Sequence, residues 1–79
     1  MFALEMRFTE QDKATIRKAI ENVMAAWMEI TPLKNPPPLW GENAARVGRH
    51  SIGCSADDLR QAELDWIEAQ VAEVIASYS

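Results

Sequence analysis

The chain is poor in cysteine and histidine, with one of each among its 79 residues. Because Cys54 has no second cysteine to bond within the chain, we expect a protein of a reducing compartment, with the cytoplasm as the default. A zinc site takes three or four cysteine, histidine or carboxylate ligands, and one cysteine and one histidine do not indicate such a site. We therefore expect neither a metal nor a cofactor.

Long hydrophobic runs and positive charges are also scarce. The longest stretch without a charged or polar side chain covers residues 23–28, whereas a membrane span needs roughly 20 apolar residues. The N-terminus has no basic leader ahead of an apolar stretch, so no signal peptide is predicted. The 12 acidic residues outnumber the 8 lysines and arginines, and the net charge of −4 opposes general affinity for nucleic acid. We expect no direct contact with a membrane or with nucleic acid.

What the chain does contain is a composition typical of a small globular domain. Hydrophobic residues make up 48% of it and charged residues 25%, close to globular averages. A chain of this length can bury only one core, so we expect residues 1–79 to form a single domain.

Two long helices are predicted by caps and by hydrophobic periodicity. Thr9 followed by Asp12 has the spacing of a capping box, and Pro32 disfavours helical geometry before it, so the first helix should cover about 10–30. Ser55 and Asp58 repeat the capping pattern ahead of a second helix over about 56–77. The expected core stripes are Ile16, Ile20, Val23, Trp27 and Ile30 on the first helix, and Leu64, Ile67, Val71, Val74 and Tyr78 on the second.

The remaining segments predict a strand and a long connection. Residues 2–8 alternate between apolar and polar side chains, which is strand periodicity with one buried face. Residues 31–53 hold all 4 prolines and all 3 glycines, and we expect an ordered proline-rich loop that is anchored by Trp40. Two structures remain open for residues 44–53: a short strand that pairs with 2–8, or a helical turn that ends at Gly48.

The predicted fold class is therefore α+β and predominantly helical. It consists of a short N-terminal strand and two long antiparallel helices joined by the proline-rich loop. The alternative is an all-α helical hairpin, although a linker of this length is unusual for a bare pair of helices.

The segment Gly48–Ser55 is the one candidate for binding chemistry. Its two glycines and its serine fit the spacing of a phosphate-binding loop, but Cys54 stands where the phosphate-contacting lysine belongs. An anion- or nucleotide-binding domain that uses this loop is thus one alternative function. His50 and Cys54 could form a base and nucleophile pair, but no other residue supports it. We expect a protein that is not an enzyme.

Surface patterns favour a protein-interaction role. Leu59 and Trp66 lie about 100–120° around the second helix from its core stripe, and Met24 and Met28 similarly lie off the stripe of the first helix. Aromatic side chains ringed by charge are typical of binding hot spots. The predicted interaction residues are Leu59, Trp66, Asp58, Asp65, Glu68 and Trp40.

A basic patch precedes the acidic second helix. We expect the patch, which consists of Arg46, Arg49 and His50, to pair with that acidic helix in this molecule or in another.

The sequence thus predicts a small non-enzymatic protein–protein interaction or regulatory protein. Its partner is another protein or a second copy in a homodimer, contacted through the second helix. A more specific version is a small acidic inhibitor that occupies the nucleic-acid-binding channel of a defence protein, as small phage-encoded inhibitors can do. Size and charge alone suggest that version, and no family motif supports it.

Overall fold

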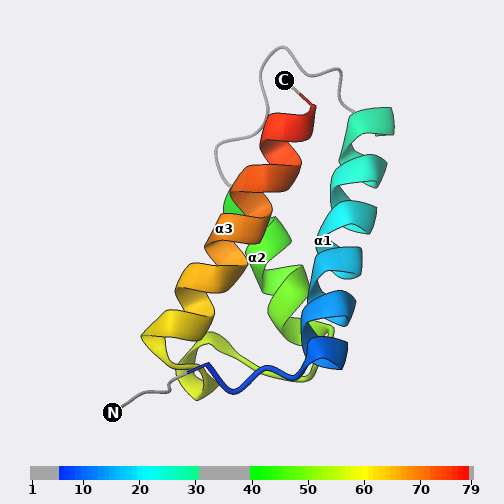
Figure 1. The fold of residues 1–79 in the computed structure, drawn as a ribbon. Coiled ribbons are helices and arrows are strands. Elements are labelled where there is room, and N and C mark those ends of the chain that lie inside the picture. The colour runs from blue at the N-terminus through cyan, green and yellow to red at the C-terminus, as the bar shows by residue number, and fades with distance from the viewer. Residues whose placement is uncertain (1–5, 31–39, 79) are drawn as a thin grey trace.

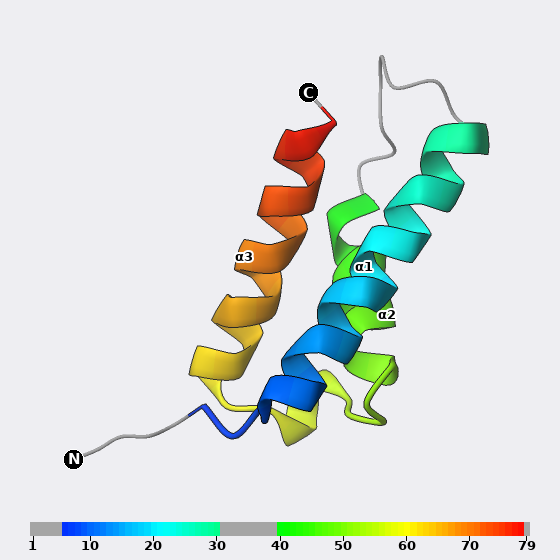
Figure 2. The same ribbon diagram turned by 45° about the vertical axis from the view of Figure 1, so that its right-hand side comes forward.

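The fold is an up-down-up arrangement of helices, as shown by a computed structural model that describes residues 6–30 and 40–78. The elements in chain order are α1 (Glu10–Ile30), α2 (Trp40–His50), the short 3-10 helix η1 (Ala56–Asp58) and α3 (Gln61–Ser77). Figures 1 and 2 show that α2 runs opposite to α1 and α3, which point the same way. Each helix packs against the other two.

The first helix begins and ends where the sequence predicts. The Thr9 hydroxyl accepts a hydrogen bond from the backbone N–H of Asp12 at 3.0 Å. In return, the Asp12 carboxylate accepts one from the backbone N–H of Thr9 at 3.2 Å. This reciprocal cap satisfies two of the donors that a helix start leaves free. The predicted boundaries of α1 and its cap are confirmed.

The second helix packs through small residues. Among residues 41–50 of α2, the buried positions are Ala44, Ala45 and Gly48. A Cβ atom on Gly48 would lie 3.2 Å from side-chain carbons of both Ile16 and Ile20. The missing side chain at Gly48 therefore lets the backbone of α2 lie directly against α1.

The core is drawn from α1, α2 and α3, and it differs in part from the predicted stripes. Met24 is fully buried, although its position lies off the predicted stripe of α1, because α1 packs against two helices and buries a wider face. Tyr78, which was expected in the stripe of the last helix, is 38% exposed just beyond the end of α3. The buried apolar residues are Ile16, Ile20, Met24, Ala44, Ala45, Ile67, Val71 and Val74.

The predicted α+β class is wrong, because the described residues contain no strand. Of the expected strand over 2–8, residues 1–5 lie outside the described ranges, and residues 6–8 have no regular secondary structure. The backbone N–H of Arg7 donates to the Glu63 carboxylate at 2.7 Å instead of to a neighbouring strand. The all-α hairpin, the alternative class, is helical but lacks α2.

The segment 44–53 is neither a strand nor a turn that ends at Gly48. Helix α2 continues through Gly48 to His50. The chain then turns at Gly53, which has a φ of +75°, in the left-handed region. The backbone N–H of Gly53 donates to the backbone carbonyl of His50, and the N–H of Cys54 donates to the carbonyl of Arg49. This is the bonding pattern of a helix end that is terminated by glycine. The helix-ending glycine is thus Gly53.

The second predicted helix is divided. Ser55 and Asp58 do form the expected cap, since the Asp58 carboxylate accepts from the Ser55 N–H and hydroxyl, but this cap opens only η1. Helix α3 starts at Gln61 with a second cap, in which Glu63 accepts from the Arg60 N–H at 2.9 Å. The predicted antiparallel packing of the two long helices is also wrong, because α2 reverses the chain between them. Of the loop expected over 31–53, residues 31–39, which hold all 4 prolines, lie outside the described residues. Residues 40–50 form α2 instead of a loop, so that part of the prediction is wrong.

Candidate functional site

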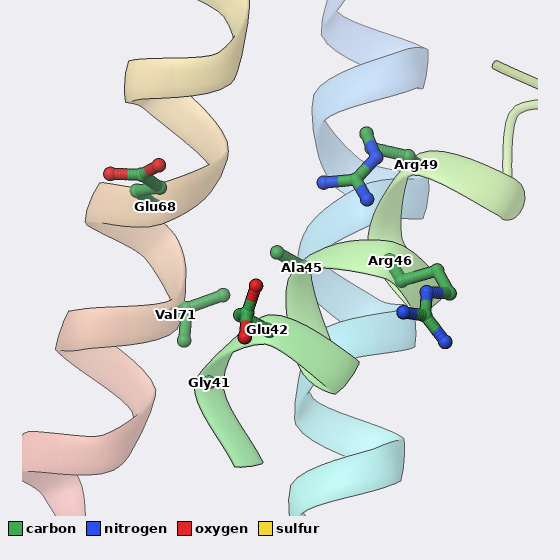
Figure 3. A pocket seen from close by; sticks show the side chains of 7 residues that line it. All are labelled: Gly41, Glu42, Ala45, Arg46, Arg49, Glu68 and Val71. Carbon is green, nitrogen blue, oxygen red and sulfur yellow. The ribbon is translucent and has the colours of Figure 1, made fainter. Parts of the chain in front are cut away.

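The candidate site is a groove between α2 and α3 with a volume of about 320 Å³ (Figure 3). It exists because α2 presents only small residues toward α3 at this level: a Cβ on Gly41 would still lie 3.8 Å from Val71. The floor is therefore apolar and shallow, and the rim is charged. We call this site the α2–α3 groove, and its lining residues are Gly41, Glu42, Ala45, Arg46, Arg49, Glu68 and Val71.

Arg49 is the most unusual side chain of the α2–α3 groove. It is half-buried, and its Nε atom is buried with no hydrogen-bond partner in the described part of the chain. Figure 3 shows its guanidinium directed toward the side of the groove where Glu68 lies, while Arg46 points away from α3. A buried donor without an acceptor costs roughly 1–3 kcal/mol. The Nε atom itself is closed to a partner, but the rest of the Arg49 guanidinium lines the groove and offers its donors to an external group.

The two arginines of the groove differ from Arg7 and Arg17, which form ion pairs. Arg7 pairs with Glu63, and Arg17 pairs with both Glu21 and Glu73. Within residues 6–30 and 40–78, no carboxylate lies at ion-pair distance from Arg46 or Arg49. The predicted pairing of the basic patch with the acidic last helix of the same molecule is thus not made by these two arginines.

The apolar members of the predicted interaction set are partly covered by their own chain. Trp66 is half-buried and meets the ring of Phe8 edge to face, with the ring centroids 5.8 Å apart. Leu59 is also half-buried and packs against the core. The apolar flank of α3 is therefore already in contact with the segment that precedes α1.

The acidic members of the predicted set do not share one surface. Asp58 is exposed and caps η1, and the hydrogen bonds from Ser55 lower its pKa. Asp65 accepts a hydrogen bond from Gln61 at 2.8 Å. Glu68 lines the α2–α3 groove, about 200° around the helix from Trp66. Trp66 and Glu68 therefore lie on different flanks of α3, and Asp58 lies in η1, outside that helix. The side chain of Trp40, the remaining member, lies outside the described part of the chain.

The sequence missed the most tightly bound carboxylate of the molecule, Glu63. Its side chain is 1% exposed and lies 3.0 Å from the Arg7 guanidinium. Hydrogen bonds from the Arg7 side chain and from the backbone N–H groups of Arg60 and Arg7 lower the pKa of Glu63 to about 2. This pair fastens the segment before α1 to the start of α3. A helix start placed at residue 61 would have marked Glu63 as a capping residue, but no local signal points to Arg7.

Other polar sites of the molecule give weaker indications of binding. A second hollow of about 450 Å³ near the start of α3 contains Cys54, Arg7 and Glu63, but its ion pair is already formed. In the predicted phosphate-binding segment, Gly48 is buried within α2 rather than placed in a loop. Among the described residues, no group of three or more histidine, cysteine and acidic side chains could hold a metal ion. None of the described helices has the length and apolarity to cross a membrane.

No protein-family model, curated protein or solved structure matches this chain. The described residues define a small bundle of α1, α2 and α3 with a charged groove, and the function has to be argued from that groove.

Proposed function

We propose that this chain is a small non-enzymatic protein-interaction module that receives its partner in the α2–α3 groove. The observation that carries the proposal is the guanidinium of Arg49, which lines the groove and has no ion-pair or hydrogen-bond partner within the described residues. A partner that brings a carboxylate to this guanidinium forms the charge-assisted hydrogen bonds that the described residues leave unmade. The protein would thus bind through α2 together with one flank of α3, rather than through the Trp66 flank.

The charges of the groove indicate the chemistry of the partner. A carboxylate matches an arginine best, because the two groups pair through parallel hydrogen bonds. Arg46 lies one turn before Arg49 and adds to the attraction for an acidic side chain. Glu42 and Glu68 on the rim attract cations. The partner surface should therefore carry both acidic and basic side chains around a small apolar centre.

Composition supports binding to protein in a reducing compartment. The net charge of −4 opposes nucleic acid as the direct partner, and the lone cysteine suits the cytoplasm. Among the described residues that line the groove there is no serine, threonine, cysteine, histidine or lysine, which favours recognition over covalent catalysis.

Site-specific photo-crosslinking tests the proposed surface. A photoreactive residue at position 46 should give a discrete covalent adduct in lysate of the source organism, either with a second copy of the chain or with another protein. The same residue at position 18, which is exposed on α1, should give none. Addition of Arg49→Ala to the position 46 probe should reduce the yield of the adduct.

A probe at position 65 separates this proposal from its nearest rival. Asp65 is exposed on α3 outside the α2–α3 groove, and it belongs to the interaction set predicted from the sequence. Adducts from position 65 with none from position 46 would place the binding surface elsewhere on α3 and contradict the proposed groove.

A further inference from the structure

The charges of α2 are arranged so that this helix complements a second copy of itself. Glu42 and Arg49 lie about two helical turns apart, roughly 10.5 Å along the axis, and on nearly the same flank of the helix. Glu42 is exposed and Arg49 is half-buried, and both line the α2–α3 groove. When such a helix meets an identical antiparallel helix, the acidic end of each lies opposite the basic end of the other.

We propose that the α2–α3 groove is a homodimer interface in which α2 packs antiparallel on α2 of a second copy. This inference rests on the proposed function of the groove as a protein-binding surface and names its occupant. The two-fold axis passes beside Ala45, so that Glu42 of each copy faces Arg49 of the other. Because a two-fold contact is reciprocal, both ion pairs form together.

The small residues of α2 allow the two helices to approach. Ala45 lies midway between Glu42 and Arg49, and it is 8% exposed. Packed helices lie about 8–10 Å apart when the side chains at the contact are small enough. The guanidinium of Arg49, which lines the groove and has no carboxylate partner within the described residues, is then placed to pair with Glu42 of the second copy.

Arg46 strengthens the same contact. It is exposed, lines the groove and lies one turn from Arg49, so it adds positive charge near the end of α2 that Glu42 of the second copy approaches, although its guanidinium points away from α3. An unrelated partner would need the same charges in the same order and spacing. A second copy of this chain has them by construction, and it is therefore the occupant that the charge pattern favours.

Paired charge reversals test the proposal. Light scattering of the unmodified chain at micromolar concentration should give twice the chain mass of 8.9 kDa. Glu42→Arg alone and Arg49→Glu alone should each raise the dissociation constant by about 10- to 100-fold, since each introduces two like-charge contacts. An equimolar mixture of the two variants should return to the doubled mass, because each supplies the charges that the other has lost.

Charge changes outside the groove test whether the effect is specific to this interface. Lys18→Glu and Glu29→Lys make similar charge changes on exposed positions of α1 and should leave the dimer unchanged. Circular dichroism checks that both groove variants remain folded. A dimer that resists the reversals, or a mixture that stays monomeric, would overturn the inference. A chain that is monomeric throughout but crosslinks from position 46 to another protein would overturn the homodimer and leave the proposed function standing.

Discussion

At the scale of single residues, the Arg7–Glu63 pair is the strongest polar contact that the sequence did not reveal. The Glu63 carboxylate is nearly inaccessible and accepts hydrogen bonds from Arg7 and from the Arg60 N–H. We expect Glu63→Gln to lower the free energy of unfolding by about 2–3 kcal/mol, because it removes the charge from a buried pair. Urea denaturation followed by circular dichroism measures this loss.

A matched variant at an exposed ion pair shows how much of the loss of stability in Glu63→Gln is due to the burial of Glu63. Glu73 pairs with Arg17 at 2.8 Å, but its side chain is 62% exposed. Glu73→Gln should therefore cost less than about 1 kcal/mol, as exposed ion pairs do. Equal losses from the two variants would show that the Glu63 pair has no special role in the fold.

The same carboxylate predicts how stability depends on pH. The pKa of Glu63 falls from 4.5 to about 2 on folding, so the unfolded chain binds the proton more readily. The stabilisation is therefore complete above about pH 4.5 and is lost as the pH falls toward 2. As the pH is lowered from 4.5 toward 2, the free energy of unfolding should decline more steeply for the unmodified chain than for Glu63→Gln. Parallel curves would contradict the depressed pKa.

At the scale of secondary-structure elements, capping patterns between residues close in sequence predicted the start of α1 correctly. The helix whose burial depends on packing, α2, was not predicted. The start of α1 follows from Thr9 and Asp12, whose hydrogen bonds are local. Helix α2 was missed because its buried positions are alanine and glycine, which create no hydrophobic stripe. The turn at Gly53 was assigned to Gly48 for the same reason: a glycine that relieves crowding and a glycine that ends a helix look alike in sequence.

The two glycines of α2 that face other helices should respond differently to substitution. Gly48→Val places methyl groups against Ile16 and Ile20, both fully buried, and overpacking of this kind costs about 1–3 kcal/mol. Gly41→Ala meets only an ordinary contact with Val71, so stability should hold or rise slightly through helix propensity. Thermal unfolding of both variants checks this. A Gly48→Val protein as stable as the parent would refute the close packing of α2 on α1.

At the scale of the whole molecule, the unexpected helix decides the architecture. With α2 present, α1 and α3 point the same way, and the groove forms between α2 and α3. The sequence did single out three of the charged residues that line this groove: Arg46 and Arg49 as a basic patch, and Glu68 as an interaction residue. It did not single out Glu42. It could not place them together, because their proximity depends on how α2 and α3 pack against each other.

Trp66 distinguishes the surface predicted from sequence from the surface proposed here. Its indole packs on Phe8 and against the core, so Trp66→Ala should lower the free energy of unfolding by about 2–3 kcal/mol. Since Trp66 and Glu68 lie on opposite flanks of α3, the same variant should leave both the dimer and crosslinking from position 46 unchanged wherever it remains folded. Light scattering under conditions where circular dichroism shows native helix content makes the comparison. Loss of association in a folded Trp66→Ala protein would return the binding surface to the aromatic flank of α3.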